Sequence, residues 1–239
     1  MQLTRLELLA PARNAEIGIA AIDCGADAVY IAGPAFGARA AAGNEVEEIA
    51  RLCRYAHLYG ARIFATVNTL IQPEETEEAL ALMQALYEAG VDVFIVQDLN
   101  LLSLPLPPVE LHASTQTAIR TPERAKALEA LGFKRLVLER QLTLEQVRAI
   151  REAVQCELEV FVHGALCFCH SGQCYMSSLI GRRSGNRGMC AQPCRMQYSM
   201  GRRMDDYPLS LKDNCLVDYL DELERDGVSC VKIGGRVRR

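Results

Sequence analysis

The sequence predicts an α/β fold: a closed, TIM-like (β/α)8 barrel of eight parallel strands with helices between them. Short apolar runs alternate with longer amphipathic segments along all 239 residues. The length is close to the roughly 250 residues of such barrels. Eight apolar runs can be distinguished, which favours a closed barrel over an open sheet. The predicted strands are residues 6–9, 28–31, 62–67, 93–96, 109–112, 135–138, 158–162 and 230–233.

The segments between these strands carry signals for helix ends. Asn14, Asn44, Thr121 and Thr143 are candidate N-caps, since their side chains can accept a hydrogen bond from a backbone N–H of the first helical turn. A glycine follows the predicted end of each of five helices, as is common after helix C-termini. These glycines are at positions 25, 60, 90, 132 and 227.

One connection breaks the regular spacing. Residues 163–209 separate the seventh strand from the next helix, whereas such loops usually have 2 to 6 residues. This insertion leaves the carboxyl end of a strand, where barrel enzymes build their active sites. The chain ends directly after the eighth predicted strand. We therefore expect one domain over residues 1–239, truncated at its C-terminus, without a closing eighth helix and with its last face bare or covered by a partner chain.

Composition places the chain among soluble globular enzymes, with 50% hydrophobic and 23% charged residues. No apolar run approaches the ~18 residues of a membrane span. The first ten residues lack the apolar core and cleavage site of a signal peptide. We therefore expect a cytoplasmic protein, in which clustered thiols are more often metal ligands or catalytic groups than disulfides.

Five of the ten cysteines fall within the insertion. Four thiolates suit a [4Fe-4S] cluster as well as zinc, but the spacing lacks the two close CxxC pairs of a zinc ribbon. We expect an iron-sulfur cluster, with zinc as the less favoured occupant. The predicted ligands are Cys167, Cys174, Cys190 and Cys194, and Cys169 or Cys215 could replace Cys194 as the fourth.

Positive charge is concentrated in the same insertion. The net charge of the chain is −4, yet residues 163–203 contain six arginines and no Asp or Glu. A basic surface beside a candidate cofactor site predicts an anionic partner, and a solvated loop is the alternative. The arginines are Arg182, Arg183, Arg187, Arg195, Arg202 and Arg203, of which the first four are our substrate-binding candidates.

Polar residues stand at the predicted carboxyl ends of several strands, where a barrel would bring them to one mouth. They are Asn68, Asp98, His112, Ser114, Gln116, Glu139, Arg140 and His163. His112, Glu139, His163 and Asn68 are the catalytic candidates, although a histidine at a strand end is about as often structural. Glu139 and Arg140 should point to opposite sides, so at most one of them faces the mouth.

Several common catalytic motifs are absent from the sequence. It contains neither a phosphate-binding loop nor a GxGxxG dinucleotide motif after the first strand. It also lacks the GxSxG nucleophile elbow and the HExxH zinc-protease helix. The machinery of ordinary hydrolases is therefore not visible.

The sequence resembles peptidase family U32, the collagenase-like proteins, over essentially its whole length. Specific stretches include His112-Ala-Ser-Thr-Gln116, Ser171-Gly-Gln-Cys174 and the segment from Asn186 to Arg195. Further matches are residues 7–12, 25–30, 36–39, 42–44, 67–69, 159–167 and 209–213. The resemblance implies an α/β barrel whose four cysteines hold a [4Fe-4S] cluster, and Arg39 and Gln116 in these stretches join the substrate-binding candidates.

The resemblance also implies an activity. Better-understood members of the family look like oxygen-independent hydroxylases of a base in ribosomal or transfer RNA, with prephenate implicated as the oxygen donor, or of a ubiquinone precursor. We expect an RNA-base hydroxylase. The alternatives are a peptidase, as the family name records, and a non-catalytic subunit whose partner completes the barrel.

Two residues depart from the family pattern. Arg13 and Gly234 stand where family motifs commonly have Gly and Glu, so the resemblance does not carry over the carboxylate at position 234.

Overall fold

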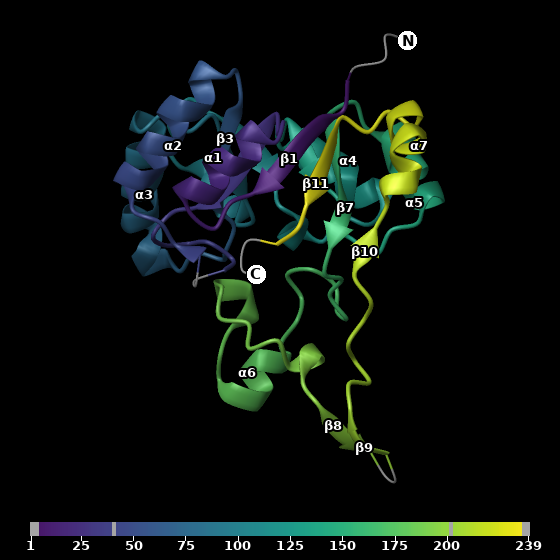
Figure 1. Cartoon of the computed structure of the whole chain (residues 1–239). Coiled ribbons are helices and arrows are strands. Elements are labelled where there is room, and N and C mark those ends of the chain that lie inside the picture. The colour runs from purple at the N-terminus through teal and green to yellow at the C-terminus, as the bar shows by residue number, and fades with distance from the viewer. Residues whose placement is uncertain (1–4, 40–41, 201–202, 236–239) are drawn as a thin grey trace.

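The barrel predicted from the sequence is present in the computed structural model, which describes residues 5–39, 42–200 and 203–235 (Figure 1). Consecutive strands pair in parallel, and the last strand, β11, pairs with both β7 and β1, which closes the sheet. This chain thus supplies all eight barrel strands itself. They are β1 (Glu7–Pro11), β2 (Ala28–Ala32), β3 (Arg62–Val67), β4 (Val93–Val96), β5 (Glu110–Ala113), β6 (Arg135–Val137), β7 (Glu157–Gly164) and β11 (Cys230–Ile233).

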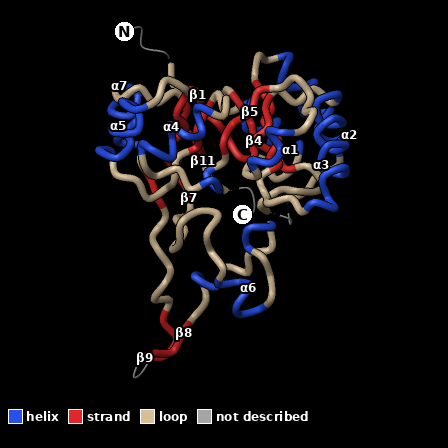
Figure 2. Tube along the Cα trace, turned by 180° about the vertical axis from the view of Figure 1, so that it is seen from behind, coloured by secondary structure: helices blue, strands red, loops and turns tan. Residues whose placement is uncertain are grey.

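Helices surround the barrel and bury the outer faces of the strands (Figure 2). The α-helices are α1 (Ala15–Asp23), α2 (Val46–Leu58), α3 (Thr76–Glu88), α4 (Pro122–Ala130), α5 (Leu144–Ala153) and α7 (Leu220–Arg225). Between β4 and β5 the connection is the 3-10 helix η3 (Leu99–Ser103) instead of an α-helix. Further 3-10 turns are η2 (Pro73–Glu75), η4 (Thr115–Thr117) and η7 (Val217–Tyr219).

Three of the four predicted N-caps are confirmed. The side chains of Asn14, Thr121 and Thr143 each accept a backbone N–H at the start of α1, α4 and α5. The prediction for Asn44 was wrong, because Glu45 precedes α2. The Asn44 amide instead donates to the backbone carbonyls of Arg13, Ala32 and Ala42, which ties the loops that carry Arg13 and Ala42 to the end of β2.

Ionic side chains fill part of the barrel interior, beside apolar residues such as Phe64 and Ile95. Arg135 on β6 has a side-chain exposure of 2%; its Nη1 lies 2.7 Å from Glu7 Oε1 and its Nε 2.7 Å from Glu157 Oε2. Burial alone would raise the pKa of Glu7, but Arg135 and Arg62 outweigh it and lower this pKa to about 2. Glu7 therefore stays ionised inside the barrel.

The insertion leaves the barrel after β7 and projects beyond the carboxyl ends of the strands (Figure 1). It contains α6 (Met176–Gly181), the 3-10 turns η5 (Gly185–Arg187) and η6 (Pro193–Arg195), and the antiparallel pair β8 (Tyr198–Met200) and β9 (Arg203–Asp206). The chain returns through β10 (Asn214–Cys215), which pairs antiparallel with β7.

Membrane-spanning segments were also sought. None of the helices in the part of the chain that the structure describes is both long and apolar enough to cross a bilayer.

We predict that Arg135→Met destabilises the barrel by about 3–5 kcal/mol, because it removes the buried cation that Glu7, Glu157 and Glu159 share. The free energy of unfolding from urea denaturation measures this effect. Arg51→Met is the matched control: Arg51 pairs with Glu16 and Glu48 on the surface, and its loss should leave that free energy unchanged. Equal stability of the Arg135→Met variant and the wild type would contradict the prediction.

Candidate functional site

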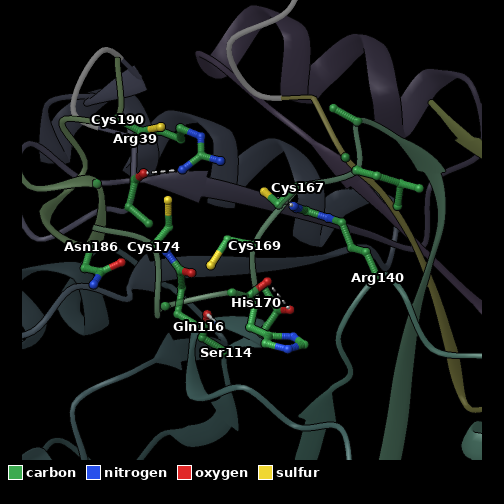
Figure 3. A pocket seen from close by; sticks show the side chains of 18 of the residues that line it. Arg39, Ser114, Gln116, Arg140, Cys167, Cys169, His170, Cys174, Asn186 and Cys190 are labelled. Carbon is green, nitrogen blue, oxygen red and sulfur yellow. Dashed lines mark hydrogen bonds between the residues drawn. The ribbon is translucent and has the colours of Figure 1, made fainter. Parts of the chain in front are cut away.

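A cavity of about 370 Å³ lies between the barrel mouth and the insertion (Figure 3). The barrel and its loops form one side, and residues 165–195 of the insertion supply much of the other. Barrel residues that line it include Tyr30, Arg39, Asn68, Ser114, Gln116, Arg140, Phe161 and Lys232. The barrel side of the cavity therefore combines an aromatic floor, three cations and several neutral hydrogen-bonding groups.

All five cysteines of the insertion line this cavity, including the four predicted ligands. Burial and the neighbouring Cys174 raise the pKa of Cys169, and burial and Cys167 raise the pKa of Cys194. Cys215 is exposed on β10 and is not among the lining residues. Only Cys169 therefore remains beside Cys194 as a candidate fourth ligand.

The thiols do not gather in threes around one point in the described part of the chain. Among the residues that the structure describes, no three His, Cys, Asp or Glu side chains are grouped so that they could hold a single metal ion. An iron-sulfur cluster has a different requirement, because each thiolate binds a separate iron. The donor set fits such a cluster, with soft sulfur ligands on several sides of one cavity.

The cysteine-bearing loop is held against the barrel by close backbone contact. Gly172 has a φ of 74°, and a Cβ atom at this position would overlap the backbone oxygen of Gln116. Glycine is therefore required here for both conformation and space. The contact joins the Ser171–Cys174 stretch of the insertion to the loop that follows β5.

Glu139 adds a second attachment for this loop. Its carboxylate accepts a 2.8 Å hydrogen bond from the backbone N–H of Ser171 and lies 3.1 Å from His170 Nδ1. Gln141 Nε2 also donates to the carbonyl oxygen of Cys167, at 2.8 Å. Glu139 is buried and does not line the cavity, so it positions the cysteine loop from the side that faces away from the cavity.

Arg140 faces the cavity, as the alternation with Glu139 predicts. Its guanidinium lies 4.0 Å from the centre of the Phe161 ring, and its Nη1 is 3.8 Å from Cys167 Sγ. Burial lowers the pKa of Arg140, a shift that the nearby Cys167 opposes. The cation is thus held beside a candidate ligand, with no carboxylate of the described residues in an ion pair with it.

Lys232 on β11 is a cavity residue that the sequence did not single out. Its Nζ lies 2.7 Å from Glu159 Oε1 and 4.2 Å from the centre of the Tyr30 ring. Burial opposes ionisation of Glu159, but Lys232 and Arg135 keep its pKa below the ordinary value. The sequence signal for this residue was a lysine within a short apolar strand. The charged end of such a lysine can be buried in the barrel only when a partner of opposite charge accompanies it.

The structure brings only some of the polar strand-end residues together. Asn68, Ser114, Gln116 and Arg140 line the cavity. Asn68 accepts from the Ala38 N–H at 2.9 Å and donates to Ser114 Oγ at 3.1 Å, so it also fixes the loop that carries Arg39.

The two histidine candidates lie elsewhere, so the predicted convergence was wrong for them. His112 is buried within β5, with Nε2 2.6 Å from Glu110 Oε1, and burial lowers its pKa. The strand continues one residue beyond it, which places His112 below the mouth. His163 is exposed opposite Cys215, where the register between β7 and β11 shifts.

The arginines of the insertion have separate roles. Arg195 lines the cavity and donates to the carbonyl oxygen of Leu166 at 2.9 Å, bracing the insertion internally. Arg187 pairs with Glu75, which attaches the insertion to the loop after β3. Arg182 and Arg183 are exposed, and Arg202 lies outside the described residues. Among the insertion arginines whose side chains the structure describes, the exposed pair is thus placed to meet a large partner without rearrangement.

Residues 13–239 match the model of peptidase family U32. The chain belongs to this family. A solved U32 peptidase has the same fold, with a TM-score of 0.66 and 18% identity over 97% of this chain and 94% of that one. The family match thus agrees with the closed barrel.

Three curated relatives extend the comparison. The chain is 50% identical to the 23S rRNA 5-hydroxycytidine synthase of Escherichia coli, over 98% of this chain and 37% of the relative. It is 34% identical to tRNA hydroxylation protein P1 of Bacillus subtilis, over 97% and 59%. It is 32% identical to a collagenase of Porphyromonas gingivalis, over 100% and 63%. The chain therefore spans less than two thirds of the length of these relatives.

We predict that Glu139→Ala loosens the cysteine loop, because the Ser171 N–H loses its acceptor. A lost bond to a charged group should cost about 1–3 kcal/mol. Hydrogen exchange of peptides covering residues 165–175 should accelerate, while exchange in α2 stays unchanged. Glu139→Gln, which retains one acceptor oxygen, should have an intermediate effect. Wild-type exchange rates in the Glu139→Ala variant would refute this role.

Proposed function

We propose that this U32 chain is an iron-sulfur-dependent hydroxylase that adds oxygen to an RNA base without using molecular oxygen. The carrying observation is the single cavity that joins five thiols, basic side chains and neutral hydrogen-bonding side chains. The similarity to a 23S rRNA 5-hydroxycytidine synthase and to a tRNA hydroxylation protein supports RNA as the substrate. A cytidine of 23S rRNA is the first candidate, because the rRNA relative is 50% identical.

The proposed cofactor is a [4Fe-4S] cluster held by Cys167, Cys174, Cys190 and Cys194. The soft thiolate donors suit such a cluster, and their spacing in the sequence lacks the two close CxxC pairs of a zinc ribbon. The cluster would supply electron transfer, which amino-acid side chains cannot provide. The protein itself would contribute Arg140, whose cation beside Cys167 Sγ offsets the negative charge of a thiolate.

The remaining cavity residues would bind the reactants. Ser114 and Gln116 present neutral polar groups that suit the edge of a nucleobase, and the rings of Tyr30 and Phe161 form an apolar floor. Arg39 and Lys232 add positive charge. These cations suit an anionic small molecule, and we propose that the oxygen donor is a carboxylate such as prephenate.

Expression in an Escherichia coli strain that lacks its 23S rRNA 5-hydroxycytidine synthase tests the activity. Mass spectrometry of nucleosides from 23S rRNA should detect cytidine that carries one added oxygen, and the Cys174→Ala variant should not restore it. Unmodified cytidine in cells that accumulate the folded protein, together with cleavage of gelatin by the purified chain, would favour a peptidase instead.

Iron and acid-labile sulfide in anaerobically purified protein test the cofactor. We expect both in the wild type, with the visible absorption of a [4Fe-4S] cluster, and a large loss of both in Cys174→Ala. Cys215→Ala is the control, because Cys215 lies away from the cavity. Stoichiometric zinc without sulfide would overturn the cluster assignment.

A further inference from the structure

The exposed end of α6 combines apolar and basic side chains. Tyr175, Leu179 and Ile180 expose 64%, 85% and 63% of their surface. Arg182 and Arg183 follow directly and are also exposed. We call these five residues the α6 surface. Large apolar side chains at such exposure lose contact with water only when a partner covers them.

The α6 surface adjoins the cavity. Met176 and Ser177, in the first turn of α6, line the cavity wall, and Leu179 and Ile180 lie one turn further along. Met176, Leu179 and Ile180 share one side of the helix, because residues three and four positions apart are neighbours. An apolar strip therefore runs from the cavity rim to the exposed end. Six residues of helix span only about 9 Å.

Charge identifies the class of partner. Residues 163–203 contain no Asp or Glu, so neither arginine of the α6 surface has a carboxylate nearby in its own segment. The Nε of Arg183 donates to the Met189 carbonyl, which orients the exposed guanidinium. A surface with arginines and no acidic groups complements a polyanion. A nucleic acid is a polyanion that also offers the apolar faces of its bases, which can cover Leu179.

A base within structured RNA must leave its stack before it can enter a cavity, and this costs a few kcal/mol. Apolar side chains inserted between bases offset such a cost in other nucleic-acid-binding proteins. Resting on the function proposed above, we infer that the α6 surface docks the RNA substrate. Leu179 and Ile180 occupy the space beside the extruded base, and Arg182 and Arg183 contact the flanking phosphates.

Two double variants separate these roles. Filter binding of deproteinised 23S rRNA, measured over a series of salt concentrations, gives the affinity and its salt dependence. Arg182→Ala/Arg183→Ala should weaken binding and reduce the slope of log affinity against log salt by about 2, one for each lost phosphate contact. Leu179→Ala/Ile180→Ala should weaken binding roughly tenfold and leave this slope unchanged, because apolar contacts release no counterions.

Matched controls lie on α2, in the helix layer of the barrel. Leu58 is 81% exposed and Arg54 is also exposed. Leu58→Ala/Arg54→Ala should bind RNA as the wild type does. All substituted residues are at the surface, so circular dichroism should be unchanged throughout.

The outcomes distinguish this inference from the proposed function. If the wild type fails to bind RNA, the proposed function falls and the inference falls with it. If the wild type binds and both α6 double variants bind equally well, only the inference is overturned. Unchanged RNA binding with loss of a wild-type dimer in Leu179→Ala/Ile180→Ala, measured by sedimentation velocity, would assign the surface to protein contact instead.

Discussion

The site depends on how the cysteine-bearing loop is seated on the barrel. The backbone of Gly172 touches that of Gln116, and the buried carboxylate of Glu139 binds the adjacent N–H of Ser171. Together these contacts place five thiols over the barrel mouth, where the strands end in polar side chains. The barrel thus supplies a rigid floor, and a short stretch of loop backbone sets where the thiols lie above it.

Electrostatics connects this mouth to the barrel interior. Lys232 faces the cavity, but its carboxylate partner, Glu159, belongs to the deeper ionic group around Arg135. Arg140 and Lys232 both lie near the Phe161 ring, and Arg140 has Cys167 as its polar neighbour. Because the acidic groups lie below the cavity and the cations at its wall, the cavity presents positive charge to whatever enters it.

Sequence patterns predicted the features that local chemistry determines. Apolar runs alternating with amphipathic segments located all eight strands, and crowded thiols in an unusually long connection located the site. The features that the sequence did not predict depend on contacts between residues far apart in the chain. The positions of His112 and His163 depend on strand register, and the exclusion of Cys215 depends on its antiparallel pairing in β10. Asn44 has the chemistry of an N-cap, but its amide donates to the backbone carbonyls of Arg13, Ala32 and Ala42, which no local pattern reveals.

The return strand β10 has a consequence for how such a protein can diversify. Asn214 pairs with Gly164, so the insertion leaves and rejoins the barrel at adjacent points of one strand. The entropy of closing a loop grows only slowly with its length. Residues can therefore be gained or lost in the part of the insertion furthest from β7 and β10 without moving the eight barrel strands. The outer part of the insertion, such as the β8–β9 pair, can thus change to suit a different target while the Ser171–Cys174 stretch keeps its contacts with the barrel.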